Sequence, residues 1–368
     1  LVGSEMCIRD SVYPAVALAR VFQRHYQDCQ VLFVGADGGM ELKLVAQEGY
    51  PIATVTISNF RRSLSPKQWG HNLKSAWNVV HSRRQAGILK DFSPDLVVGT
   101  GGYASFPAVR HAAKRGIPPA VHESNAVPGL TTKTLSKVVD VVMVGFEEAV
   151  KSYEDPSKVK VTGTPVRPDF FALTRQQARA KLGLTDDRPV VLSFWGSLGA
   201  SVMNREMLDF MACWREEDMP FHHIHGAGRD YETMRQGLSG RGLDPKDFDL
   251  RQYIYDMPTV MAAADLVLCR AGASTLSELT ATGKPAILVP SPNVTANHQF
   301  KNAKVLSDRG GALLVEEKDC SGQKLYGMVQ DLLADGAGRD RMSQAQLSLA
   351  VPTAAEDIYQ ALMKRMGH

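Results

Sequence analysis

Short apolar runs alternate along the chain with longer segments in which apolar residues recur every three or four positions. The short runs predict β-strands, and the longer pattern predicts amphipathic helices. Strands are expected at residues 30–35, 52–57, 95–98, 119–122, 139–144, 158–161, 189–194, 221–225, 266–269, 286–289 and 312–315. Alternation of strand and helix is typical of parallel sheets covered by helices on both faces. The pattern therefore predicts an α/β protein.

A proline-rich turn divides this alternation into two halves. The segment Gly163-Thr-Pro-Val-Arg-Pro-Asp169 holds one glycine and two prolines, which favours a linker. We expect a first domain over residues 1–163 and a second over 164–350. A break at Pro352 precedes a last helical pattern at 353–365, so the segment 351–368 is expected to pack back on the first domain.

The start of the chain departs from the pattern. Residues 1–11 carry neither a strand-like run nor a glycine loop, although an α/β domain is expected to open with a strand. A helical pattern follows, with Ser11 as a candidate cap and Pro14 in the first turn. We interpret this start as truncated or replaced; a disordered natural terminus is the alternative.

Composition narrows the function classes. The 42 basic and 39 acidic residues leave a formal charge of only +3, whereas nucleic-acid binding favours a concentrated basic face. The five cysteines are scattered, which favours a reducing cytoplasm over a disulfide framework. The sequence predicts no metal site and no cofactor. No apolar run approaches the roughly 20 residues that span a bilayer, so any membrane contact is expected to be peripheral.

Two glycine-centred loops are the strongest chemical signal. Gly99-Thr-Gly-Gly-Tyr-Ala-Ser-Phe-Pro107 and Trp195-Gly-Ser-Leu-Gly-Ala200 each follow an expected strand and precede a helix. Such a turn brings backbone N–H groups and the positive end of a helix dipole to one point, which suits phosphate. The two loops predict two nucleotide-type halves facing each other across a cleft. The glycine spacing at 99–104 with Glu123 also fits a dinucleotide fingerprint, so an NAD-dependent enzyme is an alternative.

Polar residues after other strands suit sugar recognition. Glu123 is a candidate general base and Asn125 a candidate partner for a sugar hydroxyl, although Asn125 equally suits a turn that caps the next helix. Glu278 lies early in a helix, where it can bind two ribose hydroxyls or only stabilise the helix dipole. Gln299 can hydrogen-bond a sugar.

An apolar stripe lies in the helical pattern from about residue 66 to 90. Trp69, Leu73 and Trp77 recur at helical spacing, with lysines and arginines beside them. Such a stripe is usually core. An apolar face edged by basic residues is also how a helix lies on an anionic membrane, and the pattern does not separate the two.

Together and in this order, the segments resemble the bacterial peptidoglycan N-acetylglucosaminyltransferases. The matching stretches are GTGGYASFPA (99–108), HESNAVPGLT (122–131), GTPVRPD (163–169), GSLGA (196–200), CRAGASTLSELTATGKPAILVP (269–290) and NHQFKNA (297–303). The resemblance implies a glycosyltransferase-B fold: two Rossmann-like domains with parallel sheets, the acceptor at the first and the donor in the second. It implies transfer of GlcNAc from UDP-GlcNAc to the 4-hydroxyl of the muramoyl sugar of undecaprenyl-linked lipid I, which forms lipid II on the cytoplasmic membrane face.

The resemblance also implies a map of the site. The residues expected to contact UDP-GlcNAc are Asn125, Arg167, Ser197, Ile254, Ala273, Ser274, Thr275, Leu276, Ser277, Glu278 and Gln299. Gly101, Gly102 and Tyr103 are expected at the lipid I diphosphate, with Glu123 as the remaining candidate for the catalytic base. Trp69, Leu73 and Trp77 match a membrane-docking patch. Other cell-wall synthesis proteins are candidate partners.

The chain departs from the family at its start. The family has a strand and the loop Gly-Gly-Thr-Gly-Gly-His before Val12, whereas this chain has Met6-Cys-Ile-Arg-Asp-Ser11, with Ser11 at the position of the loop histidine. Trp195 and Asn297 stand where the family favours glycine and aspartate. Another enzyme of the same fold, such as a glycolipid glycosyltransferase or a UDP-GlcNAc epimerase, and a non-catalytic UDP-sugar binder are the alternatives.

Overall fold

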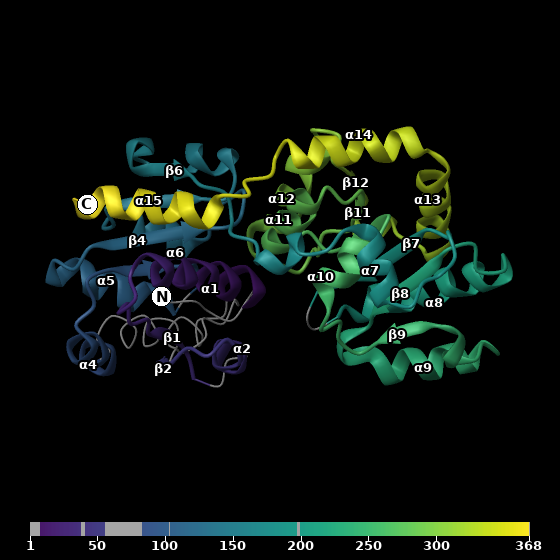
Figure 1. The fold of residues 1–368 in the computed structure, drawn as a ribbon, viewed down its shortest axis with the longest axis horizontal. Helices are drawn as coiled ribbons and strands as arrows, with labels where there is room; N and C mark the ends of the chain where they lie inside the picture. The colour runs from purple at the N-terminus through teal and green to yellow at the C-terminus, as the bar shows by residue number, and fades with distance from the viewer. Residues whose placement is uncertain (1–7, 38–40, 56–82, 103, 197–198, 368) are drawn as a thin grey trace, which may run out of the picture. The chain divides into compact units, whose positions relative to one another are not determined.

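The computed structural model describes residues 8–37, 41–55, 83–102, 104–196 and 199–367. The chain divides into two compact units, shown in Figure 1: Leu1–Val166 with Val351–His368, and Arg167–Ala350. Each unit alternates strands and helices, and every strand pair in the described residues is parallel. The α/β class with parallel sheets is therefore confirmed. The acceptor and donor roles of the two units stay predictions.

The first unit holds a two-stranded and a four-stranded sheet, β1-β2 and β3-β4-β5-β6. Its strands are β1 (Phe33–Ala36), β2 (Ile52–Val55), β3 (Val97–Gly99), β4 (Pro119–Glu123), β5 (Val141–Val144) and β6 (Val159–Val161). Its helices are α1 (Ile8–His25), α2 (Glu41–Gln47), α4 (Arg83–Phe92), α5 (Ser105–Arg115), α6 (Leu130–Leu135) and α15 (Ala354–Met366). The short 3-10 helices η1 (Glu147–Ser152) and η2 (Pro156–Lys158) precede β6.

The last helix of the chain, α15, packs beside the first, α1. Ile358, Leu362 and Met363 of α15 share a buried cluster with Leu18 and Val21 of α1. The ring of His25 stacks on that of Tyr359 with 4.1 Å between centroids. Figure 1 shows the yellow C-terminal helix in this first unit, far in sequence from its neighbours.

The expected start of the first helix is wrong. α1 begins at Ile8, so Ser11 lies inside the helix and Pro14 stands in its interior. Proline has no N–H to bond the carbonyl four residues earlier, which disfavours an interior position. The apolar face outweighs this local penalty, because Val12 and Val16 are buried against Phe33 and Val45.

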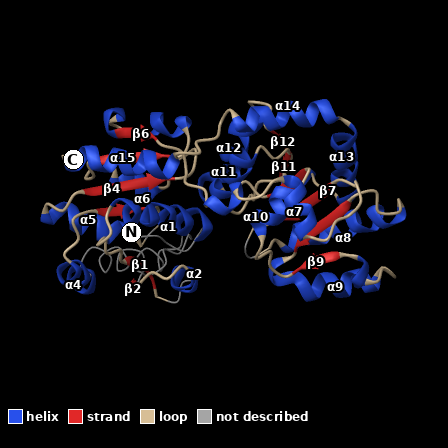
Figure 2. Ribbon diagram, viewed as in Figure 1, coloured by secondary structure: helices blue, strands red, loops and turns tan. Residues whose placement is uncertain are grey.

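The second unit is built on one six-stranded sheet. Its strands are β7 (Val190–Phe194), β8 (His222–Gly226), β9 (Asp249–Arg251), β10 (Leu266–Cys269), β11 (Ala286–Leu288) and β12 (Ala312–Leu314). Its helices are α7 (Arg175–Lys181), α8 (Ser201–Glu216), α9 (Tyr231–Gly240), α10 (Met257–Ala263), α11 (Ala273–Thr282), α12 (His298–Ser307), α13 (Gly322–Ala334) and α14 (Gly336–Leu347). Figure 2 shows the strands in red between blue helices.

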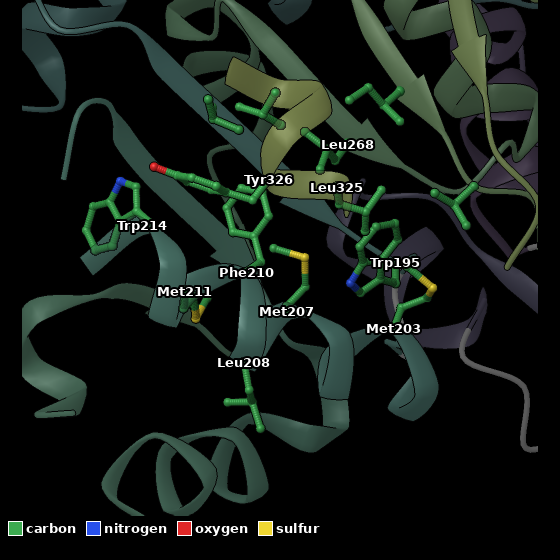
Figure 3. Close-up of a cluster of buried hydrophobic side chains, with 14 of the residues drawn as sticks. Trp195, Met203, Met207, Leu208, Phe210, Met211, Trp214, Leu268, Leu325 and Tyr326 are labelled. Atoms are coloured by element: carbon green, nitrogen blue, oxygen red, sulfur yellow. The ribbon is translucent and has the colours of Figure 1, made fainter. Parts of the chain in front are cut away.

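The core of this second unit lies where α8 and α13 cover the sheet. Met207 and Phe210 of α8 meet Leu325 and Tyr326 of α13, with Trp195 at the end of β7 in the same cluster (Figure 3). Trp195 is 3% exposed, and its indole Nε1 has no hydrogen-bond partner within the part of the chain that the structure describes. The tryptophan that replaces a family glycine is therefore a core residue.

Two features of the secondary structure were not anticipated or could not be checked. β9 (Asp249–Arg251) was missed, because an edge strand of sequence Asp-Leu-Arg has no apolar run and owes its existence to pairing with β8. The amphipathic pattern expected over residues 66–90 is described only from α4 onward, and residues 56–82 lie outside the described part of the chain.

A buried histidine pair lies inside the second unit. His223 and His225 on β8 flank Ser193 of β7, whose Oγ lies 2.8 Å from His223 Nε2 and 2.7 Å from His225 Nδ1. Burial lowers the pKa of His223 to about 3 and holds that of His225 well below its ordinary value. Both imidazoles are therefore neutral at physiological pH.

This neutrality predicts loss of stability in mild acid. The unfolded chain binds a proton on each imidazole below its ordinary pKa of about 6.5, whereas the folded chain does not, so stability is present above pH 6.5 and is lost as the pH falls. The loss approaches about 1.4 kcal/mol per pH unit for each histidine. Urea unfolding at pH 6.5 to 5 measures it. The His223→Leu variant should lose the part of the slope that this histidine contributes, and a flat wild-type profile would contradict the prediction.

Candidate active site

The strand order of the second unit reverses at its centre. The order is β12-β11-β10-β7-β8-β9, so β8 and β9 follow β7 on one side and the chain then returns to β10 on the other. In open parallel sheets, ligands bind beyond the carboxyl ends of the strands at such a reversal. Here that point lies between the loop after β7 (195–200) and the loop after β10 (270–272), both of which lead into helices.

Helix α11 presents its N-terminus at this point. It begins at Ala273 after Gly272, which has extended backbone angles and no side-chain cap. Helix geometry leaves the first amide N–H groups without acceptors inside the helix, and the dipole makes this end positive. The predicted contact residues 273–278 are the first two turns of α11, so the segment offers backbone donors to an anion.

Glu278 lies in the second turn of α11 and is 5% exposed. It is close enough to β10 that its charge, together with burial, raises the pKa of the Cys269 thiol. The turn between them is held by Arg270, which pairs with Glu317 and donates from Nη1 to the carbonyl of Val289 at 3.0 Å. A buried carboxylate on a firmly held turn is suited to accept hydrogen bonds from hydroxyls.

Two further residues predicted to contact UDP-GlcNAc, Gln299 and Ile254, follow other strands of the same sheet, whereas Arg167 follows β6 of the first unit's sheet. Gln299, on α12 after β11, is 9% exposed, and its Oε1 accepts a hydrogen bond from the amide of Ser291 at 2.8 Å. Ile254 follows β9 and packs against Gly226, where an added Cβ would lie 3.1 Å from Ile254 Cδ1. Arg167 caps the short helix η3 (Pro168–Phe171), with its guanidinium over the ring of Phe170.

Asn302 was not among the predicted site residues, but it supports the turn before α11 directly. Its side chain is fully buried, and Nδ2 donates to the carbonyl of Ala271 at 3.2 Å, one residue before the cap of α11. The signal available in the sequence was its place on the second turn of α12, one helical turn after His298. For a test of Glu278, an exposed carboxylate is therefore a better control than Asn302.

Some predicted residues lie outside the described part of the chain. These are Tyr103, Ser197 and the three residues of the apolar stripe, Trp69, Leu73 and Trp77. Their roles stay predictions.

The first unit gathers its predicted residues at the ends of two neighbouring strands. β3 pairs with β4, so the loop holding Gly101 and Gly102 begins beside the loop that starts at Glu123. Gly101 and Gly102 have φ angles of +96° and +75°, a region that favours glycine. The carbonyl of Gly102 accepts a hydrogen bond from Ser105 Oγ at 2.8 Å, which ties this loop to the first turn of α5.

Glu123 holds the loop that follows it. Its Oε1 accepts hydrogen bonds from the backbone amide of Asn125 at 3.1 Å and from Asn125 Nδ2 at 2.9 Å. Its Oε2 accepts from the amide of Gly129, the residue before α6, at 2.9 Å. Three donors occupy most of the acceptor sites of this 4% exposed carboxylate and leave little capacity for a substrate proton. The observed geometry favours a positioning role, with Asn125 bound into the turn.

Other polar groups surround this loop and were not anticipated. His122 Nε2 lies 2.9 Å from the carbonyl of Gly163, and burial lowers the pKa of His122. Burial and the Glu123 charge raise the pKa of Tyr153. Among the described residues, the buried hydroxyls of Tyr153 and Thr164 have no hydrogen-bond partner. His122 is the neighbour of Glu123 in the sequence, whereas only the fold brings Tyr153, Gly163 and Thr164 to this loop from distant segments.

Replacing Glu123 with alanine should raise the KM for the acceptor about tenfold or more. The substitution removes three hydrogen bonds to a carboxylate, each of which contributes about 1.5–3 kcal/mol, so the 124–129 loop loses its anchor. Steady-state kinetics with each substrate varied measures this effect, with exposed Glu147→Ala as the control. A base role predicts the opposite split: kcat falls while the acceptor KM stays unchanged.

The described residues contain neither a group of three or more histidine, cysteine or acidic side chains placed to hold a metal nor a helix long and apolar enough to cross a membrane.

Comparison with known proteins identifies the family. Residues 11–144 match the glycosyltransferase family 28 N-terminal domain, and residues 190–358 match the glycosyltransferase family 28 C-terminal domain. The chain belongs to glycosyltransferase family 28. Its N-terminal match holds the Gly101–Gly102 and Glu123 loops, and its C-terminal match holds the strand reversal at β7 and β10. The family 28 match favours sugar transfer over the NAD-dependent alternative.

Curated family 28 relatives cover almost the whole chain. One from Desulforamulus reducens is 36% identical over 358 residues, 96% of this chain and 95% of the relative. One from Bacillus subtilis is 36% identical over 352 residues, 95% of each. Both are named UDP-N-acetylglucosamine--N-acetylmuramyl-(pentapeptide) pyrophosphoryl-undecaprenol N-acetylglucosamine transferase.

Solved structures agree with this assignment. The crystal structure of Acinetobacter baumannii MurG matches with a TM-score of 0.71 at 27% identity, over 99% of both chains. A UDP-GlcNAc 2-epimerase from Neisseria meningitidis bound to UDP-GlcNAc matches with a TM-score of 0.64 at 15% identity, over 99% of this chain and 98% of that one. The second likeness shows the fold alone. The glycosyltransferase-B architecture predicted for this family 28 chain is confirmed.

Proposed function

We propose that this chain transfers GlcNAc from UDP-GlcNAc to the 4-hydroxyl of the N-acetylmuramoyl sugar of undecaprenyl-diphospho-muramoyl pentapeptide, which forms lipid II. The observation that supports it most directly is the C-terminal edge of the second sheet. There the N-terminus of α11, Glu278, Gln299 and Ile254 follow strands of one parallel sheet around its point of reversal. The two relatives described above are named for this activity, and the match covers 95% of the length of each.

The donor is proposed to bind with its diphosphate at the strand reversal. The first amides of α11 and the loop after β7 face the negative charge, Glu278 accepts from the ribose hydroxyls, and Gln299 bonds the GlcNAc. During transfer the acceptor oxygen bonds to the anomeric carbon, the bond from that carbon to the diphosphate breaks, and the hydroxyl proton passes to a base. Backbone donors fixed at the diphosphate stabilise the charge that develops on the departing UDP.

The acceptor is proposed to bind at the first unit. Gly101 and Gly102 bring backbone close to its diphosphate, and Glu123 holds the neighbouring loop in shape. Both oxygens of the Glu123 carboxylate accept hydrogen bonds within that loop. The kinetic test of Glu123→Ala described above decides whether this residue is also the base. The membrane role of Trp69, Leu73 and Trp77 and any partner among cell-wall synthesis proteins stay predictions.

The lipid-linked acceptor implies contact with a membrane surface, which we propose is peripheral. Helices α5 and α6 contact each other and together carry the exposed basic residues Lys114, Arg115 and Lys133. Leu130, the first residue of α6, and Val138, which follows that helix, are 74% and 44% exposed. Basic side chains around exposed apolar ones favour an anionic lipid surface. Cosedimentation with vesicles that contain anionic lipid measures this, and equal binding to neutral vesicles would argue against it.

The decisive experiment is release of UDP from UDP-GlcNAc by the purified chain. Release that requires a lipid I analogue and yields a disaccharide product supports transfer. Conversion of UDP-GlcNAc without acceptor would indicate an epimerase or hydrolase of the same fold. Binding of UDP-GlcNAc with no turnover under any acceptor condition would indicate a sugar-nucleotide binder and would contradict the proposal.

A further inference from the structure

The buried histidine pair is one part of a longer chain of hydrogen bonds that ends at helix α8. Beyond Ser193, the ring of His225 reaches Asn204 Oδ1 from Nε2 at 3.1 Å. Asn204 Nδ2 lies 2.8 Å from the carbonyl of Ala227 and 2.9 Å from Asp230 Oδ2. Asn204 is 2% exposed and stands in the first turn of α8, directly after the glycine loop of β7.

The direction of each hydrogen bond in this series is fixed by its last residue, Asn204. A carbonyl and a carboxylate only accept, so the Asn204 amide nitrogen must face Ala227 and Asp230 and its oxygen must face His225. His225 Nε2 therefore carries a proton, and its Nδ1 accepts from the hydroxyl of Ser193. That hydroxyl oxygen in turn accepts from Nε2–H of His223. Each imidazole has one defined neutral tautomer.

The series of hydrogen bonds ends at the carbonyl oxygen of Ala227, which lies close to Gly199 in the loop after β7. A Cβ added at Gly199 would lie 2.5 Å from the Ala227 oxygen and 3.3 Å from Asn204 Nδ2, and Gly199 has a φ of +73°. The same carbonyl thus accepts a hydrogen bond from the Asn204 amide and lies directly against Gly199. Ser201, the first residue of α8, donates to the other oxygen of Asp230 at 3.1 Å.

We propose that Ser193, His225 and Asn204 are positioning residues that hold the N-terminus of α8 and its glycine loop at the geometry that binds the donor's diphosphate. The proposal rests on the proposed function for the identity of the anion. His223 completes the series by bonding the far side of Ser193. These residues come from β7, β8 and α8. A substitution at a buried position of the two strands is therefore expected to disturb the N-terminus of α8, where the diphosphate is proposed to bind.

Four variants test the proposal. Ser193→Ala removes the central hydroxyl, and Asn204→Asp keeps the size of the side chain but cannot donate to Ala227. His225→Gln keeps a donor for Asn204, whereas His225→Leu does not. We expect the KM for UDP-GlcNAc and the Kd for UDP to rise together by about tenfold or more in Ser193→Ala, Asn204→Asp and His225→Leu, with the acceptor KM unchanged. His225→Gln should stay within about threefold of the wild type.

The control is His222, the residue before His223 on the same strand. His222 begins β8 and bonds Asp186 at 2.6 Å, at the amino end of the sheet and away from the loop. His222→Leu should leave the KM for UDP-GlcNAc unchanged. Lower melting temperatures with unchanged UDP affinity in the three disruptive variants would overturn the positioning role and leave only a structural one.

A spectroscopic measurement on the wild type tests the bond directions independently of activity. Two-bond nitrogen–proton correlations in histidine-labelled protein should show His223 and His225 as neutral Nε2–H tautomers throughout pH 5.5–8, assigned by their loss in single variants. An Nδ1–H tautomer of either histidine, or titration of either ring between pH 5.5 and 8, would overturn the assigned hydrogen-bond directions. If the wild type keeps these tautomers but binds no UDP, the proposed function fails and the positioning role fails with it, while the tautomer pattern still stands.

Discussion

Replacing Glu278 with alanine is expected to weaken UDP binding about 100-fold or more. The side chain is 5% exposed in the second turn of α11, and the proposed function gives it two ribose hydroxyls to accept from. Hydrogen bonds to a charged group contribute about 1.5–3 kcal/mol each, so two of them account for about 3 kcal/mol or more. Isothermal titration with UDP measures the change, and the kcat/KM for UDP-GlcNAc should fall by a similar factor.

Two controls make the Glu278 result specific. Glu232→Ala removes an exposed carboxylate from α9, where it lies 3.6 Å from Arg235, and should leave UDP affinity unchanged. Asn302→Ala is a poor control, because this buried amide bonds Ala271 ahead of α11 and should itself weaken binding. Equal UDP affinity for the wild type and Glu278→Ala would remove the ribose role and with it the donor map.

Ending the chain after Thr353 is expected to unfold the first unit. The truncation removes α15, whose Ile358, Tyr359, Leu362 and Met363 are all buried against α1 and the sheet. Burial of each such side chain contributes about 1.5–3 kcal/mol, so their combined loss of about 6–12 kcal/mol is comparable with the whole stability of a domain. Circular dichroism and urea unfolding of the truncated chain measure the effect.

A shorter truncation provides the control for α15. Removing only His368 leaves α15 and its C-cap Gly367 in place and should not move the unfolding midpoint. Ile358→Ala, which keeps the helix but deletes one buried side chain, should cost about 2–5 kcal/mol. A chain ending at Thr353 that unfolds at the wild-type midpoint would show that α15 contributes little to the first unit.

Most of the residues predicted to contact UDP-GlcNAc could be placed on the fold from sequence because they follow recognisable strands; Ile254 is the exception, since it follows the missed strand β9. Leu266–Cys269 was predicted with its observed bounds, and the small-residue turn after it opens α11 as expected. The glycine loop after Phe194 was equally visible. These strands are buried on both faces, so their apolar runs are continuous and their ends are marked by glycine.

The roles of single polar residues could not be assigned in the same way. Glu123 was predicted as a base; its carboxylate bonds Asn125 and Gly129, and the base role stays a prediction. Asn302 was not among the predicted site residues, yet it supports the turn before α11. Trp195 was noted only for standing where the family favours glycine, and it is part of the core. In each case the deciding contact involves hydrogen-bond geometry or packing that a residue's place in the chain does not specify.

The amino-acid sequence by itself determined the α/β alternation and the glycine turns that end β3 and β7, because strand burial and backbone conformation are local demands on residue type. It also carries the family, through segments spread over most of the chain. Only the tertiary structure decided the strand reversal between β7 and β10, the place of α15 beside α1 and the bond directions from His223 to Asn204. Those depend on which elements meet, and pairing between distant segments is set by the packing of the whole unit.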